Sequence, residues 1–98
     1  MLEGKEREIK NEFLELLNQR TLVMDGAMGT MIQQYGLKAG ECPEIWNITN
    51  PDIVKKIHAS YLEAGADIIL TNTFGANGLK LQKYGCRNRL PELNEQGV

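Results

Sequence analysis

A continuous apolar run, Asp67-Ile68-Ile69-Leu70-Thr71, decides which folds are open to this chain. Apolar and polar residues do not alternate in it, and uninterrupted apolar strands are typical of parallel sheets that are covered on both faces. A shorter run, Leu22-Val23-Met24, ends at Asp25-Gly26 and predicts a second buried strand. The two runs together predict an α/β fold with parallel strands.

Helical patterns surround both predicted strands. Apolar residues at helical spacing predict helices from about Lys5 to Asn18 and from about Met28 to Tyr35. Asn50-Pro51-Asp52 is a helix start, with a capping Asn, Pro at the first helical position and an acid in the first turn, and Gly65 ends that helix. We further expect an irregular stretch at residues 37–49 and a glycine-containing loop at residues 72–78. A short helix should follow and end at Gly85, and residues 91–98 are expected to begin another helix.

The order of these elements predicts βα units. Two strands alone cannot form a stable parallel sheet covered on both faces, because their outer edges stay unpaired. A (β/α)8 TIM barrel needs about 250 residues, whereas this chain has 98. We therefore expect the leading helix and first two βα units of such a barrel, with residues 1–98 forming the N-terminal part of a domain truncated at its C-terminus.

Charge and composition exclude several classes of protein. The net charge is -2 and the basic residues are scattered, which argues against a nucleic-acid-binding surface. No run approaches the ~18 apolar residues of a membrane span, and the charged N-terminus lacks a signal-peptide core, so we expect a cytoplasmic protein. Cys42 and Cys86 are too few and too far apart for a local metal site, and they are expected to be free thiols.

The segment after the first predicted strand, Asp25-Gly26-Ala27-Met28-Gly29-Thr30, is the first candidate site. Gly26 and Ala27 let a ligand approach backbone N–H groups that open the next helix and favour a carboxylate. The Asp25 carboxylate favours a cation instead and could hold an ammonium group. The N–H groups and Asp25 together therefore suit a zwitterionic amino acid. The alternative is a tight turn in which Asp25 caps the helix.

The segment after the second predicted strand, Thr71 to Asn77, is the second candidate. Asn72 and Thr73 offer an amide and a hydroxyl for orienting a ligand, and loops after parallel strands meet on the ligand face of α/β folds. The alternative is a polar cap that ends the strand. His58, the sole histidine, lies beside the apolar stripe of its helix and is predicted to be a packing residue.

Both candidate segments resemble signatures of one enzyme family. Asp25-Gly26-Ala27-Met28-Gly29-Thr30 is similar to the opening signature of the homocysteine S-methyltransferases. Tyr61-Leu62-Glu63-Ala64-Gly65-Ala66-Asp67-Ile68-Ile69-Leu70-Thr71-Asn72-Thr73-Phe74-Gly75-Ala76 resembles the second-strand signature of that family. The motifs occur in order, and the likeness extends from about Leu14 to the end of the chain. Within the family the chain most resembles the N-terminal homocysteine-binding barrel of the cobalamin-dependent enzymes.

The resemblance implies a zinc-dependent barrel in which the zinc-bound thiolate of homocysteine attacks a methyl group and becomes methionine. Zinc keeps such a thiolate deprotonated at neutral pH. The family's amino-acid site carries over onto Asp25, Gly26, Ala27 and Thr30, with Asn72 and Thr73 as further substrate-binding candidates. The family's zinc ligands are cysteines on later strands, and neither cysteine of this chain lies in a matching motif. The resemblance therefore implies that this piece is inactive by itself.

The methyl donor and the partners stay open. Users of methyl-cobalamin, betaine and S-methylmethionine share this opening, and cobalamin and methyltetrahydrofolate would act through other domains. The expected partners are homocysteine, the remainder of the barrel and downstream domains, with no nucleic acid and no membrane. The alternative hypothesis is a stand-alone barrel remnant that self-associates or binds a partner through its unpaired edges and apolar helix faces.

Overall fold

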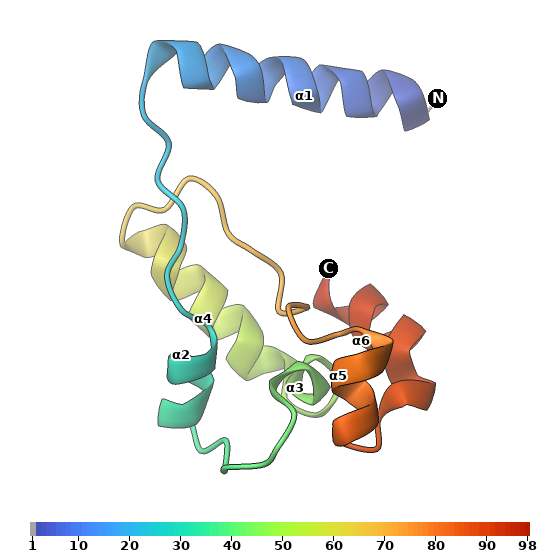
Figure 1. Cartoon of the computed structure of the whole chain (residues 1–98). Coiled ribbons are helices and arrows are strands. Elements are labelled where there is room, and N and C mark those ends of the chain that lie inside the picture. The colour runs from blue at the N-terminus through green and yellow to red at the C-terminus, as the bar shows by residue number, and fades with distance from the viewer. Residues whose placement is uncertain (1) are drawn as a thin grey trace.

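The computed structural model describes residues 2–98, and helices dominate it (Figure 1). Helices form over most of the predicted helical segments, and two short helices also lie within the stretch predicted to be irregular. In chain order the elements are α1 (Leu2–Gln19), α2 (Gly29–Gln34), η1 (Pro43–Ile45), α3 (Trp46–Thr49), α4 (Pro51–Glu63), α5 (Gly78–Lys83), η2 (Arg87–Arg89) and α6 (Leu90–Gly97), where η denotes a 3-10 helix.

The predicted α/β barrel fragment is wrong for this structure. Within residues 2–98 no segment forms a β-strand, and one isolated parallel bridge, between Met24 and Ile68, is all that remains of the expected sheet. Three backbone hydrogen bonds join the two segments: Val23 accepts from Asp67 (2.7 Å) and Ile68 (3.2 Å), and Ile68 accepts from Asp25 (2.9 Å). The apolar runs do lie side by side and parallel, but they do not build a ladder.

Two carboxylates explain why the pairing stops. At one end of the bridge the Val23 N–H donates to Asp67 Oδ2 (3.0 Å), and at the other end the Leu70 N–H donates to Asp25 Oδ2 (3.1 Å). Side chains of this kind compete with neighbouring backbone for the same donors. Because the next donor at each end goes to a side chain, the backbone pairing stays confined to the residues around Met24 and Ile68.

The apolar core consists of two clusters that share Ile45. The first joins α2, α3 and α4 around Ile32, Trp46, Val54 and Ile57. The second joins η1, α5 and α6 around Cys42, Leu81 and Leu93. Ile45 packs against both clusters, so the segment predicted to be irregular, residues 37–49, is the centre of the structure.

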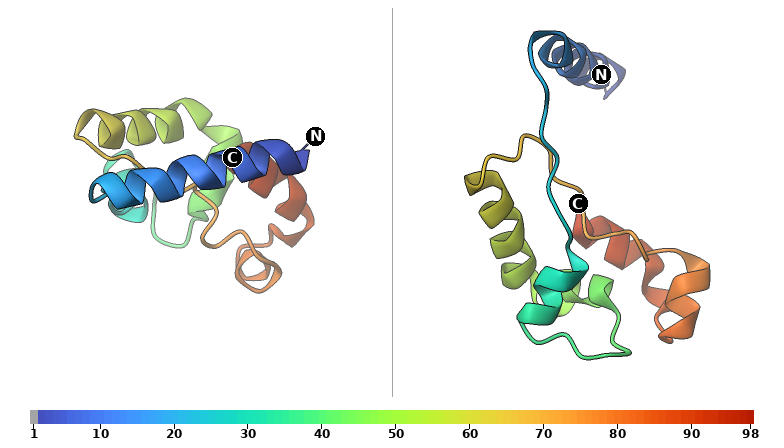
Figure 2. Two further views of the ribbon diagram at one scale, coloured as in Figure 1. Left: turned by 90° about the horizontal axis from the view of Figure 1, so that it is seen from above. Right: turned by 60° about the vertical axis from the view of Figure 1, so that its left-hand side comes forward.

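Helix α1 lies apart from this core (Figures 1 and 2). Its apolar side chains at helical spacing, Ile9, Phe13, Leu16 and Leu17, are all exposed, although the sequence pattern predicts that they face a core. The Cα radius of gyration is 15.6 Å, against about 13 Å for a compact domain of 100 residues. The described helices include none that is long and apolar enough to cross a membrane.

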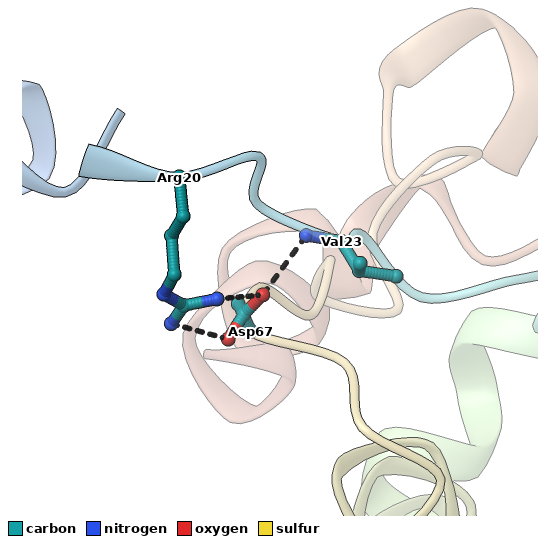
Figure 3. A network of polar contacts seen from close by, with 3 residues as sticks. All are labelled: Arg20, Val23 and Asp67. Carbon is teal, nitrogen blue, oxygen red and sulfur yellow. Dashed lines mark hydrogen bonds and ion pairs between the residues drawn. The ribbon is translucent and has the colours of Figure 1, made fainter. Parts of the chain in front are cut away.

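An ion pair anchors the end of α1 to the rest of the chain (Figure 3). The Arg20 guanidinium forms two hydrogen bonds with the carboxylate of Asp67, at 3.0 and 2.8 Å. These bonds, together with the Val23 N–H, lower the pKa of Asp67 to about 2. The carboxylate therefore stays charged and holds α1, the Val23 segment and the loop after α4 together.

Helix α4 begins and ends where the sequence predicts. Pro51 occupies the first turn, and Gly65 follows the helix with a positive φ of 109° that favours glycine. The Asn50 side chain, which was expected to cap the helix, accepts no hydrogen bond from the first turn of α4. Asn50 instead uses its backbone carbonyl, which accepts from Ile53 (3.2 Å) and Val54 (3.3 Å), while its side-chain amide donates to Thr49 Oγ1 (3.2 Å).

Candidate substrate-binding site

A cavity of about 360 Å3 lies between the segments that follow the two bridged runs. Four of the six predicted substrate-binding residues, Asp25, Gly26, Ala27 and Asn72, line it; Thr30 and Thr73 do not. The other lining residues come from the same two segments and from η1: Met28, Gly29, Pro43, Glu44, Leu70, Thr71 and Phe74. The loops therefore meet as the sequence predicts, although within residues 2–98 a single bridge, not a sheet, pairs the runs that precede them.

Asp25 lines the cavity, and only one of its two carboxylate oxygens accepts a hydrogen bond from the described residues. Its Oδ2 accepts the Leu70 N–H at 3.1 Å, whereas Oδ1 is buried and has no hydrogen-bond partner among the described residues. A buried acceptor without a donor carries a desolvation cost of about 1–3 kcal/mol. The alternative, that Asp25 caps α2, is wrong, because α2 begins after Met28 without a side-chain cap.

Gly26 and Ala27 form the part of the wall that packs on α4. A Cβ at Gly26 would lie 3.1 Å from the ring of Tyr61, and the Tyr61 hydroxyl donates to the Ala27 carbonyl at 2.6 Å. No hydrogen bond within the described part of the chain uses the N–H groups of Gly26 and Ala27. Since α2 has only six residues, an anion at this wall would depend on these loop N–H groups rather than on a helix dipole.

Asn72 is buried and tied to the protein through its amide nitrogen. Its Nδ2 donates to the Pro43 carbonyl and to Asn47 Oδ1, both at 3.0 Å. Asn47, which is also buried, donates to the backbone carbonyls of Asn72 (2.8 Å) and Leu93 (3.2 Å). The Asn47–Asn72 pair thus fixes the cavity wall to η1, α3 and α6.

The two predicted threonines lie elsewhere. Thr73 bonds Thr71 through their hydroxyls (2.7 Å) and packs against α6, where a Cβ at Gly97 would come within 2.7 Å of Thr73 Cγ2. Thr30 is exposed on α2. Thr71, which begins the second candidate segment but was not among the predicted binding residues, lines the cavity instead of Thr73.

Glu44 is a lining residue that lies outside both motif segments and that sequence reasoning missed. Its side chain is buried, with Oε1 accepting the Gly75 N–H at 2.7 Å and Oε2 accepting the Cys42 thiol at 3.3 Å. Burial, together with the hydrogen bond to Glu44, raises the pKa of Cys42. The only local signal for Glu44 is its place after Pro43 in a short helical turn.

The donor set of this chain does not fit the zinc that the family resemblance implies. Cys42 is a buried thiol whose raised pKa opposes the thiolate form that zinc binds. Among residues 2–98 no group of three or more His, Cys, Asp and Glu side chains could hold a metal ion. His58 is half-buried beside a separate, smaller hollow next to α6.

Comparison with known proteins identifies the family. Residues 22–98 match the family model described as homocysteine S-methyltransferase. The chain belongs to the homocysteine S-methyltransferase family. It is 42% identical to a methionine synthase of Mycobacterium tuberculosis over 89% of this chain, and 40% identical to that of Mycobacterium leprae over 97%. The chain spans 8% of the length of each relative, and both sequence motifs fall within the region that matches the family.

Proposed function

We propose that this chain supplies the amino-acid end of the homocysteine site in a methyltransferase of the methionine synthase type. In this proposal residues 1–98 are part of a larger homocysteine-binding domain, and the chain does not transfer methyl groups by itself. The supporting facts are the family membership, the names of the relatives and the cavity between the two motif segments.

The observation that carries the proposal is the unused buried oxygen of Asp25 at a cavity that also has unused backbone donors. Asp25 Oδ1 would accept the α-ammonium group of homocysteine. The N–H groups of Gly26 and Ala27, which line the same cavity, would donate to its α-carboxylate. A cavity of about 360 Å3 falls within the usual range for small-ligand sites, about 300–1,000 Å3.

The chemistry at sulfur belongs to other parts of the complete protein in this proposal. Zinc would make the homocysteine thiol a nucleophile, and its ligands would lie outside this chain because the thiols here do not fit the metal. The methyl donor, including the cobalamin and methyltetrahydrofolate of the cobalamin-dependent enzymes, would likewise act through other domains. This chain would bind and orient the substrate through Asp25, Gly26, Ala27 and Asn72.

Calorimetric titration with two ligands tests the proposal. L-Homocysteine and 4-mercaptobutanoate differ only in the α-ammonium group, so their difference in affinity for the 98-residue chain reports the contact with Asp25. One hydrogen bond between charged groups corresponds to roughly tenfold or more in affinity. We expect homocysteine to bind more tightly, and we expect Asp25→Asn to abolish the difference.

The matched control is Glu63→Gln, which removes one exposed carboxylate at the end of α4. This variant should retain the preference for homocysteine. If the wild-type chain binds both ligands equally, or if Asp25→Asn retains the preference, the role of Asp25 is refuted.

Self-association is a second candidate role, favoured by the exposed apolar side chains of α1. Ile9, Phe13, Leu16 and Leu17 are all exposed on α1, and exposed apolar faces mark interaction sites. Sedimentation velocity distinguishes the roles: an oligomer that Phe13→Glu converts to a monomer supports self-association, and a wild-type monomer contradicts it.

A further inference from the structure

Glu44 is a buried carboxylate that the proposed amino-acid site does not yet use. Only 6% of the residue is exposed, and acidic residues are almost never buried unless their charge is compensated. Its compensation comes from the Gly75 N–H at 2.7 Å and the Cys42 thiol at 3.3 Å. Glu44 therefore accepts hydrogen bonds within the chain with both oxygens while it lines the cavity.

The Gly75 peptide is the centre of the loop that carries Asn72 and Phe74 to the cavity. A Cβ at Gly75 would lie 2.7 Å from Glu44 Oε1, closer than real contacts allow, so the carboxylate packs directly on the backbone. Glu44 and Gly75 are 31 positions apart in sequence. Their hydrogen bond joins η1 to the loop, and both segments contribute residues to the lining of the cavity.

Other hydrogen bonds hold the same loop, but none of them uses its central N–H. Asn72 is held by its bonds with Pro43 and Asn47, and Asn94 donates to the Ala76 carbonyl at 3.0 Å. These contacts act toward the two ends of the loop. Glu44 takes the N–H in the middle, and that N–H sets the direction of the peptide next to Phe74.

We propose that Glu44 is a positioning residue of the amino-acid site: by accepting the Gly75 N–H it fixes the Phe74–Gly75 peptide, the part of the cavity wall that the bonds of Asn72 to Pro43 and Asn47 do not hold. This inference rests on the proposed function. The geometry assigns the role to the acceptor oxygen of Glu44 rather than to its charge, because the bond to Gly75 is the contact that reaches the wall.

Three substitutions at Glu44 separate an acceptor role from a charge role. Glu44→Gln keeps the side-chain length and an acceptor oxygen and removes the charge, whereas Glu44→Asp keeps the charge and is one methylene too short. We expect Glu44→Gln to bind L-homocysteine within about threefold of the wild type. Glu44→Asp and Glu44→Ala should bind up to about tenfold more weakly, the effect of one lost hydrogen bond.

Affinities are measured by calorimetry on the 98-residue chain, at a temperature where circular dichroism shows each variant fully folded. A role in folding alone would leave the affinity of the folded protein unchanged. Gly75→Ala disturbs the same contact, because the added Cβ would displace the Glu44 carboxylate, and it replaces Glu44→Ala if that variant does not fold. It should also weaken binding about tenfold.

The possible outcomes separate this inference from the proposed function. If the wild type binds, Asp25→Asn binds more weakly, and Glu44→Asp and Gly75→Ala match the wild type, the role of Glu44 is wrong and the proposed function stands. Loss of affinity in Glu44→Gln with retention in Glu44→Asp would show a charge role and overturn the inference. A wild-type chain that binds no homocysteine refutes the proposed function, and the inference with it.

Discussion

Replacing Leu81 with alanine tests how much the packing of the second cluster stabilises the folded chain. Leu81 is fully buried between η1 and α6, packed with Cys42 and Leu93. The change removes three carbons, at about 0.8 kcal/mol each, and leaves a cavity, so we expect a loss of about 3 kcal/mol within the usual range of about 2–5 kcal/mol. For a chain of 98 residues, whose total stability is of order 5–15 kcal/mol, this is a large fraction.

Leu79 on the same helix is the matched control. It is 80% exposed, so Leu79→Ala should change the free energy of unfolding by no more than about 0.5 kcal/mol. Urea denaturation followed by far-UV circular dichroism measures both variants, with a common slope required for the comparison. Equal losses in the two variants, or a larger loss in Leu79→Ala, would refute the packing of α5 described here.

Two further predictions concern ionisable groups. Because the pKa of Asp67 is lowered to about 2 by Arg20, its pairing stabilises the folded chain above the unfolded pKa of about 3.9 and ceases to do so as the pH falls toward 2. Urea denaturation should therefore show wild type and Arg20→Gln differing at pH 6 and converging near pH 2; a constant difference would exclude this pair as the cause. Cys42, which is buried with a raised pKa, should react with iodoacetamide more slowly than the half-buried Cys86, as mass spectrometry of labelled peptides can measure; equal rates would contradict the burial of Cys42.

The helices were predictable because their signals are local. Pro51 and Gly65 mark the two ends of α4 within a few residues of the backbone they affect. The same locality made the strand prediction fail: an apolar run such as 67–71 fits a strand, but a strand exists only if its N–H groups meet backbone carbonyls. Here Asp25 and Asp67 take the donors at the two ends of the bridge, and a sequence pattern does not show this competition.

The candidate site was predicted in part. The motif segments predicted Asp25, Gly26 and Ala27 as ligand-binding residues, and all three line the cavity. Glu44 was not predicted as a site residue, because its burial depends on a contact with Gly75, which is distant in sequence. The Asn72 amide illustrates a related limit, since a polar residue at a loop looks the same in sequence whether it binds a ligand or, as here, also pairs with Asn47.

The most direct test of the amino-acid site is a map of where homocysteine binds. Two-dimensional 1H–15N NMR of the labelled chain during titration with L-homocysteine reports every backbone N–H at once. We predict that the shifts concentrate at Gly26, Ala27 and Asn72, around the cavity between the two motif segments. Shifts confined to α1, or none at saturating homocysteine, would contradict the proposal that this chain holds the amino-acid end of the substrate.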